Sequence, residues 1–368
     1  MNHRWLDIAL QVLRLPTAPL YESAVAAWLK AFARERSMSV REDRHGNLLI
    51  RPRGVRRTGR PLVFAAHMDH PGFGAGRMLD GRTLLAFWRG GVPPQLFRGA
   101  RVRFFSRNRW VRGKVLAIGR NVPVGSPHPV RIRVDGPVAA GSPGMWDFPD
   151  PRVRGNLLYA RGHDCPIGVA ALASALDEIH RTAAVPFHAF FTRCEEGGFW
   201  GAIGACMSRS LPAGSTVVAL EASMALPNAR LGDGVVVRVG DRSSIFTPRV
   251  SAALLAAARA LQSEDKRFKF QRRLMDGGTC ESTVYCAYGY PSGGLCLPLR
   301  NYHNVNWEKM TLAAEAVDLR DYESLVRLIV RAATTGIDEK GAPRPTRRFE
   351  ERFALYTVSP DESVTWTR

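Results

Sequence analysis

Short apolar runs that stop at an acidic residue or a histidine are the feature that most constrains the fold of this chain. Five such places occur: His67-Met68-Asp69, Asp164, Glu195-Glu196, Glu221 and His303. A carboxylate or imidazole at the end of a buried strand is costly when nothing pairs with it. A fold that gathers these groups at one edge of a sheet removes that cost if they bind cations there.

Length and cysteine content indicate a large globular protein with an inserted or appended second domain. A chain of 368 residues exceeds one ordinary domain and can bury a sizeable core. Its six cysteines show no CxxC spacing, which predicts free, mostly buried thiols in a reducing compartment. We see no secretory signal and no apolar run long enough to cross a bilayer, so we expect a soluble, cytoplasmic protein without membrane contact.

The charge of the chain is strongly basic. Lysine and arginine outnumber aspartate and glutamate by 52 to 33, which gives a net charge of +19. An arginine-rich surface could attract nucleic acid or acidic peptides. We favour the plainer interpretation that a coding bias supplies many solvated arginines, and we do not expect nucleic acid as a partner.

Helical and strand patterns alternate along both ends of the chain. Helical periodicity covers 5–15, 23–33, 165–180, 248–261 and 319–334, and short apolar runs cover 47–50, 61–66, 187–192, 216–220 and 294–298. Such alternation predicts an α/β domain in which helices cover both faces of a sheet.

Between about residues 76 and 156 the helical periodicity disappears. Short β-type runs at 83–88, 102–105, 115–118 and 130–134 are separated by glycine, proline and aspartate. We therefore predict a small β-barrel-like domain at 76–156, inserted into a catalytic domain formed by 1–75 and 157–345. The polar tail, 346–368, has no assigned role.

Each acidic or histidine group has an ordinary structural explanation when it is taken alone. Asp164 could cap a helix, Glu221 could be a surface acid, and His303 could be a structural histidine. His67-Met68-Asp69 could be a polar loop at a strand end, although Asp69 could also hold the second ring nitrogen of a metal-bound His67. Their joint placement at strand ends favours a metal site, and a mixed oxygen and nitrogen set without thiolates suits a catalytic zinc, with cobalt or manganese as alternatives.

The Glu195-Glu196 pair follows an apolar strand and precedes the glycine-rich GGFWGAIGA. Adjacent like charges are unremarkable on a surface, but beside buried aromatic residues they repel each other. One carboxylate of the pair could bind a metal while the other stays free as a general base.

With these residues in hand, the chain resembles the M42 family of dinuclear metallo-aminopeptidases, as a divergent member. This family belongs to the zinc exopeptidases together with the M20 and M28 families. The resemblance extends from the first helices to about residue 335 and includes the β insertion. It rests on the segments HMDHPGF, HDCPIG, CEEGGFWGA, ALEAS, GGTCEST and LPLRNYHN.

The resemblance implies a role for each residue and a fold of the zinc-exopeptidase type, a mixed sheet flanked by helices. Two divalent ions would be bound: His67 and Glu221 would hold one, Glu196 and His303 the other, and Asp164 would bridge them. Glu195 would be the general base and Asp69 the residue that orients His67. The implied activity is removal of N-terminal residues from peptides, and the implied assembly is a homo-oligomer that could form through the β insertion.

The chain departs from the family pattern at several positions. Cys165-Pro166 replaces an aspartate and a basic residue, His70-Pro71 replaces an acidic and apolar pair, Cys280-Glu281 replaces Asp-Ala, and Glu221 stands where aspartate is commoner. Every expected ligand keeps a side chain that can bind a metal ion, and the altered residues line the expected substrate cleft.

Two other functions stay open. A related deacylase or carboxypeptidase-like amidohydrolase would use the same metals on another bond. A non-enzymatic role is binding of single-stranded nucleic acid or an acidic partner by the β insertion, where arginines such as Arg101, Arg103 and Arg112 alternate with Phe104, Phe105 and Trp110.

Overall fold

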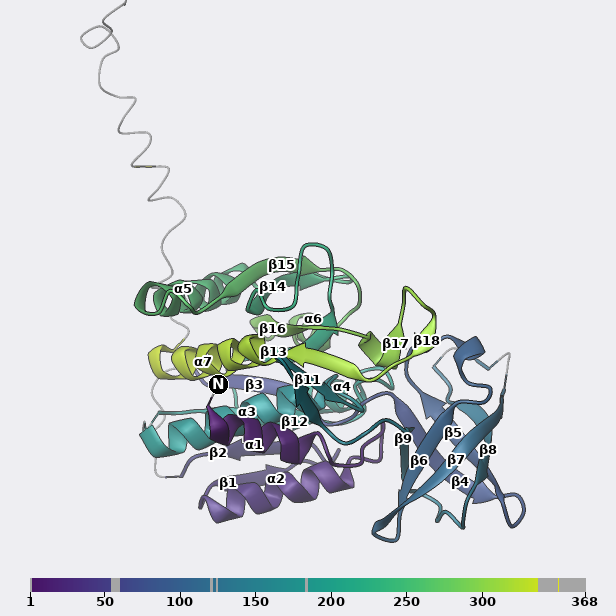
Figure 1. Ribbon diagram of the computed structural model, residues 1–368. Coiled ribbons are helices and arrows are strands. Elements are labelled where there is room, and N and C mark those ends of the chain that lie inside the picture. The colour runs from purple at the N-terminus through teal and green to yellow at the C-terminus, as the bar shows by residue number, and fades with distance from the viewer. Residues whose placement is uncertain are drawn as a thin grey trace, which may run out of the picture.

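The computed structural model describes residues 2–53, 60–119, 122–123, 125–182, 185–336 and Glu350. Within these residues, a mixed sheet of eight strands forms the centre of the larger domain (Figure 1). Its spatial order is β1 (Ser39–Glu42), β2 (Leu48–Arg51), β12 (His188–Thr192), β3 (Leu62–His67), β13 (Thr216–Met224), β16 (Ser292–Leu299), β14 (Val235–Asp241) and β15 (Phe270–Met275). The four central strands β12, β3, β13 and β16 run parallel, so their carboxyl ends meet at one edge.

Helices cover both faces of this sheet. On one face lie α1 (His3–Val12), α2 (Ser23–Glu35), α3 (Pro166–Thr182), α5 (Pro248–Glu264) and α7 (Leu319–Thr335), and on the other lie α4 (Trp200–Met207) and α6 (Glu281–Ala287). The alternation of side chains along β3 explains the two layers: Phe64 and Ala66 pack into the first core, and Val63 and Ala65 into the second.

A closed barrel stands apart from the sheet and its helices (Figure 1). Around the barrel the strands are β4 (Gly72–Met78), β5 (Thr83–Arg89), β8 (His128–Val134), β7 (Arg109–Ile118), β6 (Arg101–Ser106) and β9 (Pro143–Trp146), with the short helix η1 (Pro94–Leu96) between β5 and β6. Phe73, Trp88, Phe97 and Trp146 fill it with edge-to-face and tilted ring contacts. Closure pairs every strand and leaves no sheet edge exposed.

Small elements connect the two parts. They are β10 (Arg152–Arg154), β11 (Leu157–Ala160) and β19 (Glu315–Asp318) in one sheet, and the helix η2 (Tyr302–Asn304) followed by the hairpin β17 (Val305–Asn306) and β18 (Thr311–Leu312). The hairpin lies between the sheet domain and the barrel (Figure 1).

The observed architecture confirms the predicted fold class, a helix-flanked mixed sheet with a separate all-β unit. The sequence does not predict β1, β14, β15, α4 or α6. The barrel strands run from Gly72 to Trp146 against a predicted insertion at 76–156, and the division into domains stays a prediction. The 346–368 tail, Glu350 apart, lies outside the described residues.

All six cysteines are free, and five of them are buried, as the sequence predicts. Among the helices of the described ranges, we find none with the length and apolar character needed to span a bilayer.

Candidate active site

Two neighbouring parallel strands place His67 beside the acidic pair. Thr192, the last residue of β12, pairs with His67, the last residue of β3. The chain leaves β12 at that level and turns, so Glu195 and Glu196 follow directly beside His67. Polar groups at the carboxyl ends of parallel strands share one edge of the sheet, which is where such folds bind ligands.

The strand on the other side of β3 supplies Glu221. Ala219 of β13 pairs with Ala65 of β3, so Glu221, two residues further on, lies level with His67. The sequence predicts that this strand ends at Glu221, which is wrong, because β13 continues to Met224. Pairing with β16 supports the additional residues of β13, since the two strands stay paired up to Met224.

Asp164 and His303 come from loops. Asp164 lies two residues before Pro166, the first residue of α3, and the peptide bond between Asp164 and Cys165 is cis. Its carboxylate faces two histidines. His303 lies in η2 with a φ of 56°, a left-handed conformation that turns the chain after β16.

The first group of candidate ligands surrounds the imidazole of His67. Its Nε2 lies 3.4 Å from Oδ1 of Asp164 and 3.6 Å from Oε2 of Glu221. All three side chains are buried. Two donor atoms bound to one zinc lie about 3.5 Å apart, so this spacing suits a shared cation.

The second group surrounds His303. Its Nε2 lies 3.0 Å from Oε1 of Glu196 and 3.5 Å from Oδ2 of Asp164. The ring is fixed by stacking on Tyr302, with centroids 3.8 Å apart, and by its Nδ1, which lies 3.2 Å from the carbonyl oxygen of Gly91. Since the two oxygens of Asp164 face different histidines, one carboxylate joins both groups.

Several atoms of these groups are buried without a hydrogen-bond partner among the described residues: His67 Nε2, His303 Nε2, Asp164 Oδ1 and Glu221 Oε1. Buried polar atoms that lack partners are costly, and a bound cation is one way to satisfy them. The donor set therefore fits divalent metal ions, in two clusters that share Asp164.

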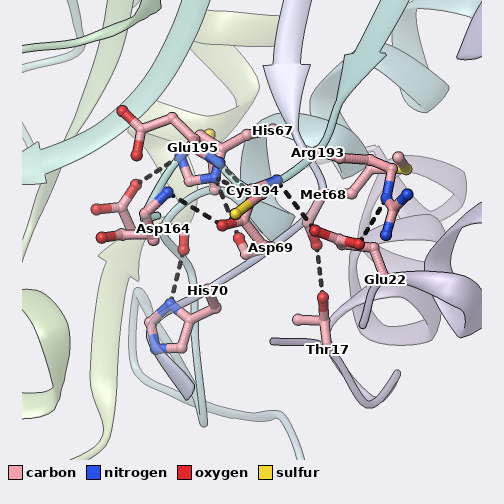
Figure 2. Close-up of polar contacts among 12 residues, drawn as sticks. Thr17, Glu22, His67, Met68, Asp69, His70, Asp164, Arg193, Cys194 and Glu195 are labelled. Atoms are coloured by element: carbon pink, nitrogen blue, oxygen red, sulfur yellow. Dashed lines mark hydrogen bonds and ion pairs between the residues drawn. The ribbon is translucent and has the colours of Figure 1, made fainter. Parts of the chain in front are cut away.

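Asp69 connects the first histidine to the acidic turn (Figure 2). Its two carboxylate oxygens accept the backbone N–H groups of Glu195, at 3.0 Å, and Glu196, at 3.1 Å. Nδ1 of His67 lies 3.1 Å from the carbonyl oxygen of Asp69 and 3.4 Å from Oδ1. Because these oxygens only accept, Nδ1 donates and Nε2 is directed at the candidate metal position.

A buried glutamate that no sequence motif marks supports the same turn (Figure 2). Glu22, 1% exposed, accepts the Nε–H of Arg193 at 2.7 Å and the backbone N–H of Cys194 at 3.0 Å. The residues just before Glu195 are therefore anchored to the N-terminal segment, which the sequence gives no means of foreseeing.

His70, one of the departures from the family pattern, lies behind Asp164. Its Nδ1 donates to the backbone oxygen of Asp164 at 2.6 Å, and its Nε2 lies 3.1 Å from Oδ1 of Asn304. Glu315 accepts the backbone N–H of Asn304 at 3.3 Å and that of Asp164 at 3.3 Å. This buried network ties the loop of Asp164 to the residue that follows His303.

Burial and mutual charge shift the titration of the site. Burial works against a charged His67, but Glu195, Asp164 and Asp69 outweigh it and raise its pKa well above the usual value. Burial raises the pKa of Glu195 well above its usual value; His67 opposes this shift, and Glu221 adds to it. A carboxylate whose pKa is raised accepts protons more readily, which suits a general base.

The structure adds one residue that the sequence analysis leaves out of the ligand set. Cys165 Sγ lies with the donor atoms of His67, Asp164 and Glu221, all within 4.8 Å of one another. The signal in the sequence is its position directly after Asp164, where the resemblance leads one to expect an aspartate.

A cavity of about 270 Å³ opens beside the two clusters. Asp164, Glu195, Glu196 and Glu221 line it together with Gly198, Phe199, Ser223, Met224, Leu226, Arg238, Met275, Gly277, Gly278, Thr279, Cys280 and Tyr302. Of the altered Cys280-Glu281 pair, Cys280 faces the cavity and Glu281 is buried. A pocket of this size beside candidate metal ligands can hold one amino-acid side chain of a substrate.

Comparison with a family model identifies the family of this protein. The model described as M42 glutamyl aminopeptidase matches residues 137–328, more than half of the chain. The chain belongs to the M42 peptidase family. It is therefore a metal-dependent aminopeptidase, a hydrolase that uses a divalent metal ion. This membership does not favour the deacylase or the nucleic-acid-binding alternative.

Solved structures of other peptidases share the fold. Aminopeptidase APDkam598 from the archaeon Desulfurococcus kamchatkensis is 21% identical, with a TM-score of 0.75 over 93% of this chain and 98% of that one. The TET aminopeptidase of the marine sediment archaeon Thaumarchaeota archaeon SCGC AB-539-E09 is 18% identical, with a TM-score of 0.73 over 90% and 96%. Pyrococcus horikoshii TET1 peptidase is 19% identical, with a TM-score of 0.72 over 89% and 99%. No curated protein matches the sequence.

Proposed function

We propose that this M42 peptidase binds two divalent metal ions, zinc in the native protein, and removes N-terminal residues from peptides. His67 and Glu221 would hold one ion, Glu196 and His303 the other, and Asp164 would bridge them. The observation that carries this proposal is the position of Asp164, whose two oxygens face the Nε2 atoms of different histidines at 3.4 and 3.5 Å. Cobalt or manganese would suit the same oxygen and nitrogen donors.

When bound, the ions would make hydroxide available near neutral pH and polarise the scissile carbonyl. Glu195 would take the proton of the attacking water and pass it to the departing amine. Its carboxyl group lines the cavity, and burial raises its pKa well above the usual value, which suits a base that must hold and release a proton.

Asp69 would fix the relative positions of the general base and the metal ligands. It accepts the backbone N–H groups of both Glu195 and Glu196, while its carbonyl oxygen fixes the ring of His67. Residues on rigid strand ends that are held by such outer hydrogen bonds keep a catalytic geometry with little reorganisation.

The cavity supports a preference for an acidic N-terminal residue. Among the described residues that line it, Arg238 is the one basic side chain, and it is 2% exposed. Its Nη1 donates to Ser223 Oγ at 3.2 Å, but its Nε has no partner among the described atoms. A buried guanidinium with a free donor suits a substrate carboxylate. The family description, glutamyl aminopeptidase, agrees with this preference.

We further propose that the protein works as a homo-oligomer. The support is the description of Pyrococcus horikoshii TET1 peptidase, which can assemble into a tetrahedron or a large octahedral shell. Light scattering after size-exclusion chromatography tests this, and a single monomeric species would contradict it. The cytoplasmic location expected from the sequence stays a prediction.

Metal analysis and substrate choice together test the proposed function. Purified protein should contain two divalent ions per chain, lose activity with a chelator, and regain it with zinc, cobalt or manganese. Glutamyl and aspartyl peptides with a free amino terminus should be cleaved, and the same compounds with an acylated amino group should not. Cleavage of only the acylated series would instead establish a deacylase.

A further inference from the structure

The sulfur of Cys165 lies among candidate ligands that the sequence analysis treats as a purely oxygen and nitrogen set. The Sγ atom, His67 Nε2 and one oxygen each of Asp164 and Glu221 all lie within 4.8 Å of one another. All four side chains are buried. Nε2 of His67, Oδ1 of Asp164 and Oε1 of Glu221 have no hydrogen-bond partner in the described part of the chain. Three unsatisfied polar side chains at the same place indicate a cation there, independently of the cysteine.

Contacts on two sides place the Cys165 thiol at this position. Its backbone N–H donates to the carbonyl oxygen of Asp69 at 3.3 Å, the same oxygen that lies 3.1 Å from Nδ1 of His67. Its S–H donates to the carbonyl oxygen of Leu220 at 3.2 Å, directly before Glu221. A Cβ at Gly168 would lie 2.4 Å from the sulfur, so glycine there leaves the room that the thiol needs.

We propose that Cys165 binds, as a thiolate, the same cation as His67 and Glu221. This inference rests on the proposed dinuclear site. On binding, the S–H bond breaks, the proton leaves to solvent, and a sulfur electron pair forms the metal–sulfur bond. The sulfur already lies within 4.8 Å of the other three donor atoms, and a zinc–sulfur bond is about 2.3 Å long.

A thiolate at this place makes the two metal positions unequal. The first ion would have four protein donors, from His67, Asp164, Cys165 and Glu221, and the second would have three, from Asp164, Glu196 and His303. Sites closed by four protein ligands hold zinc tightly, whereas sites with three keep a position for water or substrate. The first ion is therefore retained zinc, and the second is the exchangeable ion that meets the substrate. Thiolate also favours zinc over manganese.

X-ray absorption on the zinc-loaded full-length protein tests this directly. With two zinc ions bound, the spectrum should contain a sulfur shell at about 2.3 Å that corresponds to one sulfur per two zinc ions. The cobalt-substituted protein should show a sulfur-to-cobalt charge-transfer band in the near ultraviolet. Both signals should vanish in Cys165→Ser, and the tighter zinc affinity should fall by about 100-fold.

Cys206→Ser is the matched control, because it removes a buried thiol in α4 that belongs to neither cluster. Its sulfur shell, cobalt band and zinc affinity should equal those of the parent protein. Two bound zinc ions with only nitrogen and oxygen neighbours would overturn the role of Cys165 and leave the proposed function intact. A protein that binds no metal would overturn both.

Discussion

Replacement of Asp69 by asparagine tests how the acidic turn is held. The side chain is fully buried, and its two oxygens accept the backbone N–H groups of Glu195 and Glu196 at 3.0 and 3.1 Å. Asparagine keeps one oxygen and presents an NH₂ group to the other donor, so one charge-assisted bond is lost. Such a bond contributes about 1.5–3 kcal/mol.

Since about 1.4 kcal/mol is a factor of ten in an equilibrium or rate, Asp69→Asn should reduce kcat/KM by about 10–150-fold. Metal affinity should fall with it, because Asp69 holds the backbone of Glu196, a proposed ligand, and its Oδ1 lies 3.4 Å from Nδ1 of His67. Steady-state kinetics and metal titration measure these two effects, and chemical denaturation measures the accompanying loss of stability.

Asp321 provides a matched control for this variant. It is also fully buried, and its two oxygens accept the backbone N–H groups of Gly232 and Gly234, both at 2.7 Å, at a place on α7 outside the metal clusters. Asp321→Asn loses one of two backbone hydrogen bonds as Asp69→Asn does, and it should leave kcat and metal affinity unchanged. If Asp69→Asn keeps full activity, or if both variants lose activity equally, our account of Asp69 is wrong.

Three further results are expected. Glu195→Gln should keep its bound metal but lose about 10²–10⁴-fold in kcat, as measured with protein of known metal content, because glutamine cannot accept the proton; undiminished turnover would exclude this base. Arg238→Met should reduce kcat/KM for glutamyl substrates by about 10–150-fold and change that for alanyl substrates little, so an equal loss on both would remove the guanidinium from substrate recognition. Burial raises the pKa of Asp321 to about 7, so the folded state binds this proton more tightly than the unfolded state does. The protonated carboxyl group therefore contributes to stability in acid, and the contribution is lost as pH rises toward 7. Denaturation curves of Asp321→Asn should therefore depend less on pH between 4 and 7 than those of the parent; identical pH dependence would contradict the shift.

Much of the fold is predictable because it follows from local patterns. Helices α3, α5 and α7 and the central strands carry long apolar faces that only one secondary structure buries well. The strands β14 and β15 and the helices α4 and α6 escape prediction, since the helices are short and the strands carry arginines such as Arg238 and Arg272. In β14 both the valine-rich sequence and the pairing with β16 favour a strand.

The candidate metal site is likewise only partly predictable from the sequence. The identities of His67, Asp164, Glu196, Glu221 and His303 are visible in the sequence, because carboxylates and imidazoles at the ends of apolar runs need a compensating partner. That Asp164 stands between both histidines is a matter of distances across the sheet, which no spacing along the chain contains.

The sequence by itself determined the class of fold, the metal chemistry and the residues that could carry it, since those depend on residue type and local order. Only the tertiary structure decided how far apart these groups lie and what supports them. Glu22 reaches the turn at Cys194 and the sulfur of Cys165 joins the first cluster through contacts between segments remote in sequence. Such contacts are set by the packing of the whole sheet, so they exist only once the chain has folded.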